Sequence, residues 1–101
     1  MPVEPLSRTE IEARLGELPG WTLDGDRLTR TYRPGSHMAA AAMVVHVARV
    51  QDKLDHHSDL TLGYHTVSLS VHTHSAGGAV TEKDLELARR VADLAPAHGA
   101  H

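Results

Sequence analysis

The run from Thr66 to His74 (TVSLSVHTH) constrains the fold most strongly, because apolar and polar side chains alternate along it. In an extended strand, successive side chains point to opposite faces of the sheet. One face would carry the apolar set Val67, Leu69 and Val71, and the other would carry Thr66, Ser68, Ser70, His72 and His74. Such a strand is typical of an antiparallel sheet that is covered on one face and open to water on the other.

The rest of the chain supplies the elements that cover this sheet. Ser7 with Glu10 forms a capping-box pair, Asp24-Gly25 favours a tight hairpin, and Thr81 is placed to cap a final helix. The spacing predicts, in chain order, a helix over 8–18, strands over 21–23 and 28–32, a helix over 36–54, strands over 59–62 and 66–74, and a helix from 82 to about 95. This order predicts an α+β fold, a four-stranded antiparallel sheet with helices packed on one face.

Length and composition bound the class of protein. With 101 residues, 41% of them hydrophobic, the chain is expected to form a single domain over residues 1–101. Within it we expect an ordered core at about 6–95 and a loose tail at 96–101. The sequence has no cysteine and no apolar run of membrane-spanning length, so a cytoplasmic protein without a membrane partner is expected. A net charge of −3 and only 3% aromatic residues argue against a nucleic-acid partner.

Histidine is the residue type that points to chemistry. The chain has nine histidines, and five of them fall between Asp52 and Gly78. Those at a helix start or in the tail are expected to be solvated, and two that have no evident partner are expected to be structural. The first group is His37, His98 and His101, and the second is His46 and His65.

A metal site is one interpretation of the histidine density. It requires three or four ligands that converge on one point. His72 and His74 share a face of the predicted strand, and Asp52 lies one helical turn before His56. However, the adjacent side chains of His56 and His57 diverge if the backbone is extended. The pattern is therefore compatible with a metal site without being specific for one, and no metal is predicted.

Proton transfer is the second interpretation, and it demands less geometry. Imidazole can donate or accept a proton near neutral pH. A His-His pair after a helix end, a third histidine at a strand end and the Gly77-Gly78 turn would enclose a small pocket with both an acid and a base. The residues themselves therefore indicate a histidine-dependent acid/base enzyme.

The same residues resemble a known signature. An acidic residue is followed by His-His, a small residue, an aromatic residue, a further histidine and an aspartate at fixed distances. The positions are Asp52, His56, His57, Ser58, Tyr64, His74 and Asp84. Together with the flanking LPGW at 18–21 and THSAGGAVTEKDLELA at 73–88, this run resembles the pterin-4a-carbinolamine dehydratases, also called 4a-hydroxytetrahydrobiopterin dehydratases.

The resemblance implies a four-stranded antiparallel sheet with helices on one face, and dehydration of a 4a-hydroxytetrahydropterin to the quinonoid dihydropterin. The family serves pterin recycling for aromatic amino acid hydroxylases. It implies no cofactor, since the pterin is the substrate, and a homodimer or homotetramer. Carried over by position, the catalytic residues would be His56, His57 and His74, and the substrate-binding residues would be Asp52, Ser58, Thr73, Ser75 and Ala76. Asp52 would orient His56, and Asp84 would cap the last helix.

Three departures from the family pattern affect the shape of the pocket. Ser58 stands where proline is usual, Asp55 where asparagine is common, and Leu60 where many members have an aromatic residue. Some members of the family act as assembly or transcription cofactors. A non-catalytic binding role therefore remains the alternative to an enzyme, with a small metal-binding protein as the third interpretation.

Overall fold

The computed structural model describes residues 4–101, so residues 1–3 of the predicted domain range lie outside it. Each helix and strand predicted from the sequence is present, in the expected order. The elements are α1 Arg8–Leu15, β1 Thr22–Asp24, β2 Arg27–Tyr32, α2 His37–Leu54, β3 Asp59–Leu62, β4 Val67–Val71 and α3 Glu82–Leu94. Two short 3-10 helices, η1 His74–Ala76 and η2 Ala95–His98, follow β4 and α3.

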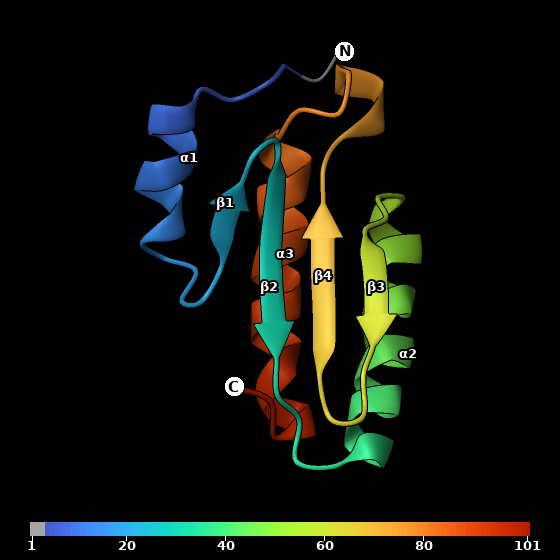
Figure 1. The fold of residues 1–101 in the computed structure, drawn as a ribbon. Coiled ribbons are helices and arrows are strands. Elements are labelled where there is room, and N and C mark those ends of the chain that lie inside the picture. Colours follow the sequence, from blue (N-terminus) through green and yellow to red (C-terminus); the bar gives the residue numbers. More distant parts are fainter. Residues whose placement is uncertain (1–3) are drawn as a thin grey trace.

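The four strands form one antiparallel sheet in the order β1-β2-β4-β3, with α2 and α3 on the same face and α1 beside β1 (Figure 1). The α+β class predicted from the sequence is therefore confirmed. The alternation in β4 is also confirmed, because Val67, Leu69 and Val71 are buried while Ser68 and Ser70 lie on the open face. None of the helices in residues 4–101 combines the length and apolar character needed to cross a membrane.

Local signals place the elements as predicted. The β1–β2 hairpin turns at Gly25, whose φ of 61° is a conformation that glycine adopts without a steric penalty. The Ser7 side chain accepts a hydrogen bond from the Glu10 backbone N–H at the start of α1. Ser36 caps α2 in the same way through the Ala39 N–H. These caps satisfy backbone donors that have no partner inside the helix.

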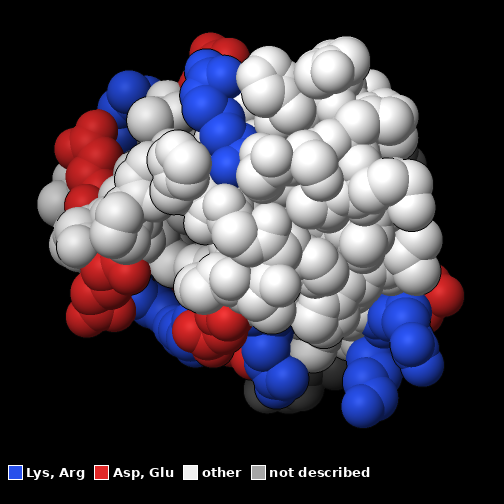
Figure 2. Space-filling model, turned by 90° about the horizontal axis from the view of Figure 1, so that it is seen from below, with Lys and Arg blue, Asp and Glu red and all other residues white. Residues whose placement is uncertain are grey.

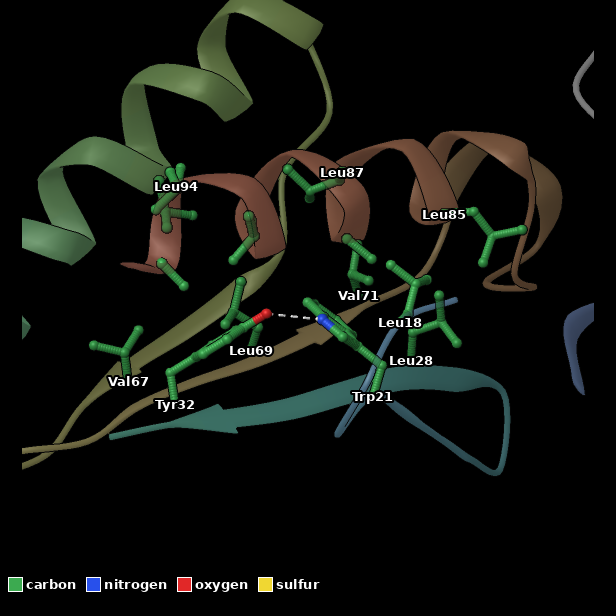
Figure 3. Close-up of a cluster of buried hydrophobic side chains, with 14 of the residues drawn as sticks. Leu18, Trp21, Leu28, Tyr32, Val67, Leu69, Val71, Leu85, Leu87 and Leu94 are labelled. Atoms are coloured by element: carbon green, nitrogen blue, oxygen red, sulfur yellow. Dashed lines mark hydrogen bonds between the residues drawn. The ribbon is translucent and has the colours of Figure 1, made fainter. Parts of the chain in front are cut away.

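The core lies between the sheet and the two long helices, and it is built almost entirely from aliphatic side chains (Figure 3). Burying one such side chain contributes about 1.5–3 kcal/mol, so the sheet and helices are stabilised mainly by each other. The least exposed members include Leu28, Met43, Val47, Val67, Val71, Leu85, Leu87 and Val91.

Two aromatic residues, Trp21 and Tyr32, form the polar contact inside this core. The Trp21 Nε1–H donates to the Tyr32 hydroxyl at 3.0 Å, and the two rings meet edge to face with centroids 6.3 Å apart. The Arg30 guanidinium lies 3.9 Å from the centre of the Tyr32 ring. Burial raises the pKa of Tyr32, against the lowering effects of Trp21 and Arg30. The phenol therefore stays protonated and accepts the indole hydrogen bond.

The expectation of a loose tail from residue 96 is not met. η2 continues directly from α3, Ala100 packs against the core, and the Arg33 N–H donates to the His101 carbonyl at 2.9 Å. His98, expected to be solvated, lies with Nε2 2.9 Å from Nδ1 of His46. The sequence did not reveal this pair because its members are 52 positions apart.

The His46–His98 pair makes the docking of η2 sensitive to pH. Burial, and next the proximity of His46, lower the pKa of His98 below its ordinary value. The folded chain therefore binds this proton less readily than the unfolded chain does. This contribution to stability is present above the ordinary histidine pKa of about 6.5 and decreases as the pH falls through and below it.

Removing the hydroxyl in Tyr32→Phe should lower the free energy of unfolding by about 1–3 kcal/mol, because the buried Trp21 N–H loses its acceptor. Chemical denaturation followed by fluorescence of Trp21, the single tryptophan, measures this. Tyr64→Phe is the matched control: Tyr64 is 80% exposed, so its variant should change the same quantity by less than about 0.5 kcal/mol. Equal effects of the two variants would contradict this description of the core.

Candidate active site

Four histidines gather around one hollow of about 300 Å³, between the end of α2, the end of β4 and the start of α3. Its lining is Asp55, His56, His57, His72, Thr73, His74, Ser75 and Lys83. Two larger hollows lie on the open face of the sheet and beside α2, with volumes of about 460 and 580 Å³. Their linings contain no histidine and one histidine, so the side chains that could exchange protons near neutral pH are concentrated at the smaller hollow.

The end of α2 sends the two adjacent histidines in different directions. Asp55 adopts a left-handed conformation, with φ 52° and ψ 43°, and closes the helix. The His56 N–H then donates to the Gln51 carbonyl at 3.0 Å, which is the reversal found at many helix ends. After this reversal His56 is 9% exposed and points inward, whereas the side chain of His57 is 54% exposed.

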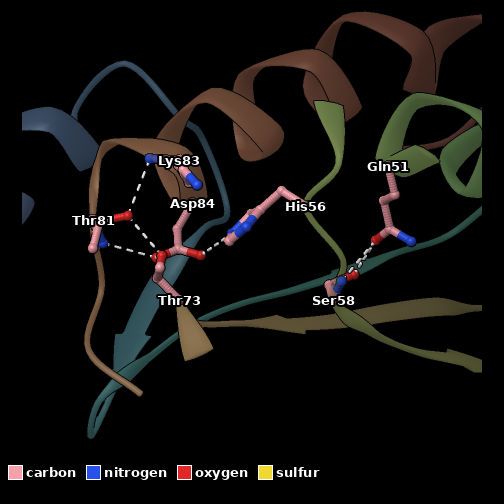
Figure 4. Close-up of polar contacts among 7 residues, drawn as sticks. All are labelled: Gln51, His56, Ser58, Thr73, Thr81, Lys83 and Asp84. Atoms are coloured by element: carbon pink, nitrogen blue, oxygen red, sulfur yellow. Dashed lines mark hydrogen bonds and ion pairs between the residues drawn. The ribbon is translucent and has the colours of Figure 1, made fainter. Parts of the chain in front are cut away.

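The carboxylate of Asp84 is fully buried and holds His56. Its Oδ1 lies 2.6 Å from Nε2 of His56. Its Oδ2 accepts from the Thr81 N–H at 2.8 Å and from the Thr73 hydroxyl at 2.7 Å (Figure 4). Asp84 also stands in the first turn of α3, where the helix dipole favours a negative charge. Three donors and a helix end therefore compensate the burial of this charge.

Two threonine hydroxyls extend the network with a defined direction. The Thr73 hydroxyl donates its proton to Asp84, so across the 2.6 Å contact with Thr81 it must accept. The Thr81 hydroxyl thus donates to Thr73 and accepts from the Lys83 N–H at 3.2 Å. Thr73 and Thr81 are buried, which leaves this chain of hydrogen bonds shielded from water.

The network fixes the tautomer of His56. A carboxylate only accepts hydrogen bonds, so Nε2 of His56 carries the proton that Asp84 receives. In the neutral ring, Nδ1 then has a free lone pair. Within residues 4–101 no hydrogen bond engages Nδ1, and this atom is not fully buried. His56 therefore presents a basic nitrogen to the hollow.

Asp52 holds His57 rather than His56, which corrects the prediction. Its Oδ1 lies 2.8 Å from Nε2 of His57, and the Asp52 side chain is 80% exposed. Because both partners are in water, this pair is weaker than the buried contact between His56 and Asp84. The contact with Asp52 uses Nε2 of His57, so Nδ1 is the ring nitrogen that no carboxylate engages.

His74 lies at the start of η1, not on an extended strand as predicted. β4 ends at Val71, and Thr73, whose backbone is still extended, forms an isolated antiparallel bridge with Ala79 just before η1 begins. His74 and Ser75 are exposed at the rim, and the rings of His72 and His74 have centroids 6.2 Å apart. The structure thus brings His56, His57 and His74 around one hollow, as the sequence predicted.

Of four other residues predicted to contact the substrate, two line the hollow and two do not. Ser75 and Thr73 line the hollow, although the Thr73 hydroxyl is already bonded to Asp84. Ser58 donates both its N–H and its hydroxyl to Oε1 of the buried Gln51, and neither Ser58 nor Ala76 lines the hollow. Within residues 4–101, no three histidine or acidic side chains are arranged to hold one metal ion.

Sequence reasoning missed the contact between Asp84 and His56. The signature includes Asp84, but its position in the first turn of α3 already gave it a role as a cap. The structure gives this residue both roles at once. Lys83, which also lines the hollow, had no signal in the sequence, and Asp55, another lining residue, stood out only as a departure from the family pattern.

Comparison with known proteins identifies the family. Residues 4–94 match the family model described as pterin 4 alpha carbinolamine dehydratase. The chain belongs to this family. A Streptomyces coelicolor protein is 78% identical over all 101 residues of both chains, and its name assigns it provisionally to the pterin-4-alpha-carbinolamine dehydratases. A protein of Sulfolobus acidocaldarius with the same provisional name is 40% identical over 85% of this chain and 93% of its own.

One solved structure agrees with this family, and a second has a similar fold. A crystal structure of a transcriptional coactivator/pterin dehydratase from Brucella melitensis superposes with a TM-score of 0.83 at 30% identity, covering 89% of this chain and 97% of the other. A pterin dehydratase-like protein, a RuBisCO assembly factor in the alpha-carboxysome, gives 0.59 at 19% identity over 73% and 84%. The second likeness concerns the fold alone.

The two aspartates that hold histidines differ in burial, and this difference predicts unequal effects on stability. Asp84→Asn should lower the free energy of unfolding by about 1–3 kcal/mol, because charged acceptors of three buried donors are lost. Asp52→Asn is the matched control and should change it by less than about 0.5 kcal/mol. Urea denaturation of both variants measures the difference. A mild effect of Asp84→Asn would show that the buried network adds little to the fold.

Proposed function

We propose that the protein catalyses the dehydration of a 4a-hydroxytetrahydropterin to the quinonoid dihydropterin, in pterin recycling. The observation that carries the proposal is the Asp84–His56 contact. It fixes a buried imidazole with its basic nitrogen open to a hollow that His57 and His74 also line. An acid and a base on one small cavity are what this reaction needs. Family membership supports the same reaction class.

The chemistry requires two proton transfers. The hydroxyl on the ring-fusion carbon accepts a proton, its carbon–oxygen bond breaks and water leaves. The neighbouring ring nitrogen loses its proton, and the electron pair of that N–H bond completes the new carbon–nitrogen double bond. One proton is given and one is taken, so the enzyme returns to its starting state once its histidines have exchanged protons with each other or with solvent.

The surroundings of each histidine suggest its part. His56 is buried and has a fixed tautomer, so we assign it the removal of the ring proton through Nδ1. His57 and His74 are exposed at the rim, where they can take up protons from water, so we assign them to protonation of the leaving hydroxyl. Ser75 at the same rim would contact the pterin edge. In this reaction the pterin is the substrate and no further cofactor is invoked.

Kinetics on a synthetic 4a-hydroxytetrahydropterin test the proposal. His57→Ala and His74→Ala should each slow dehydration by about ten-fold to a thousand-fold, the scale of losing one general acid or base. His46→Ala is the control, because His46 pairs with His98, which follows the C-terminal end of α3, whereas Asp84 lies at the other end of that helix. This variant should keep kcat within about two-fold. Every rate is compared with the uncatalysed reaction, and the wild type is also assayed after exhaustive chelation.

Each alternative gives a different result. Loss of activity on chelation, with recovery on adding zinc, would support the metal interpretation. Pocket variants that match an active wild type would place the chemistry elsewhere. A wild type that never exceeds the uncatalysed rate would indicate that the fold has been kept for binding or assembly rather than for catalysis.

We also propose that the chain forms a homodimer or homotetramer. β3 is an edge strand of the sheet, and large apolar side chains are exposed near it and on α2. They are Met38, Val45, Leu62 and Tyr64. The end of the molecule where α2 begins presents a broad uncharged surface (Figure 2). Apolar patches and open strand edges of this kind favour association with another copy.

Sedimentation measures this association. The wild type should sediment as a dimer or larger at micromolar concentration. Val45→Glu should shift it toward the monomer, because Val45 is 61% exposed on α2 and a charge there opposes apolar packing. Ala13→Glu, on the exposed side of α1, is the control and should leave the assembly unchanged. A monomeric wild type would refute the proposed assembly.

A further inference from the structure

His72 is the histidine of the hollow that the proposed reaction does not use. It follows β4 directly, lines the hollow, and its ring lies 6.2 Å from that of His74 between centroids. Its Nδ1 is buried, and no hydrogen-bond partner for it exists in residues 4–101. The other edge of the ring faces Gly78: the position that a Cβ would take there is 3.8 Å from Cδ2 of His72.

The buried nitrogen decides between the two neutral tautomers of His72. A proton on Nδ1 would leave a buried N–H without an acceptor, and such orphaned donors are rarer in proteins than unpaired acceptors. The neutral ring therefore carries its proton on Nε2. Nε2 is not fully buried, and no hydrogen bond within the described part of the chain engages it. Its N–H is thus available to a molecule in the hollow.

This orientation distinguishes His72 from its neighbours. His56 and His57 each direct Nε2–H to a carboxylate and so present an acceptor nitrogen to the hollow. His72 presents a donor instead. A ligand that fits the hollow must therefore offer an acceptor atom at the His72 position, and a ligand with an N–H there would leave two donors facing each other.

We infer that His72 is a specificity-determining residue that donates a hydrogen bond from Nε2 to the ring carbonyl oxygen of a 4-oxo pterin. The inference rests on the proposed function, because it takes the hollow to be the pterin site. The carbonyl is unchanged in the dehydration, so its hydrogen bond stabilises bound substrate and transition state alike. Loss of His72 should therefore raise KM and leave kcat close to its wild-type value.

Binding of two stable compounds tests the inference without turnover. Pterin has a carbonyl at position 4, whereas 2,4-diaminopteridine has an amino donor there; fluorescence or calorimetric titration gives both affinities. The wild type should prefer pterin. His72→Leu should weaken pterin binding by about three- to ten-fold and largely remove the preference. His72→Gln, whose amide supplies an N–H, should restore part of it, and His65→Leu, on an exposed turn, should match the wild type.

The outcomes separate the inference from the proposed function. If the wild type binds pterin and His72→Leu keeps the full preference, the assignment of His72 is wrong and the proposed reaction stands. A fall in kcat with KM unchanged would likewise overturn it. If the wild type binds neither compound and never exceeds the uncatalysed dehydration rate, the proposed function fails, and the inference fails with it. Thermal melting of each variant verifies that it is folded.

Discussion

The buried carboxylate of Asp84 is the interaction on which the site depends. It caps α3 through the Thr81 N–H, anchors the chain just after β4 through the Thr73 hydroxyl, and holds the imidazole that follows α2. Three segments that are distant in the sequence therefore meet at one side chain. A charge without these donors would be costly inside the protein, so the site forms only when all three segments have packed.

The contacts that stabilise the fold also set the tautomer of His56. The caps and core that place α3 on the sheet also place Asp84, and Asp84 fixes which nitrogen of His56 is basic. The more exposed side of the hollow is built differently. There His57 is hydrogen-bonded to the solvated Asp52, and His74 lies in a short 3-10 helix. A buried imidazole and exposed rim groups suit the proposed reaction, in which one proton is removed inside the pocket and another is exchanged with water.

The fold could be predicted from the sequence because its signals are local. Alternation in Val67–Val71, the Asp24-Gly25 turn and the caps at Ser7 and Thr81 each determine a neighbouring element. The site could be predicted only in part. The resemblance named His56, His57 and His74, which the structure places around one hollow. It paired Asp52 with His56, because the left-handed conformation of Asp55, which directs the two following histidines apart, has no strong signature in the sequence. The partners of His56 and His98 lie 28 and 52 positions away, beyond any local pattern.

Nitrogen-15 NMR of the histidine side chains tests the central claim most directly, because it reports which ring nitrogen carries the proton. At a pH where the rings are neutral, His56 should appear as a single tautomer with its proton on Nε2, and this proton should exchange slowly because it is buried against Asp84. Asp84→Asn should abolish that signature. A His56 ring protonated on Nδ1, or one that averages between the two tautomers in the wild type, would contradict the account.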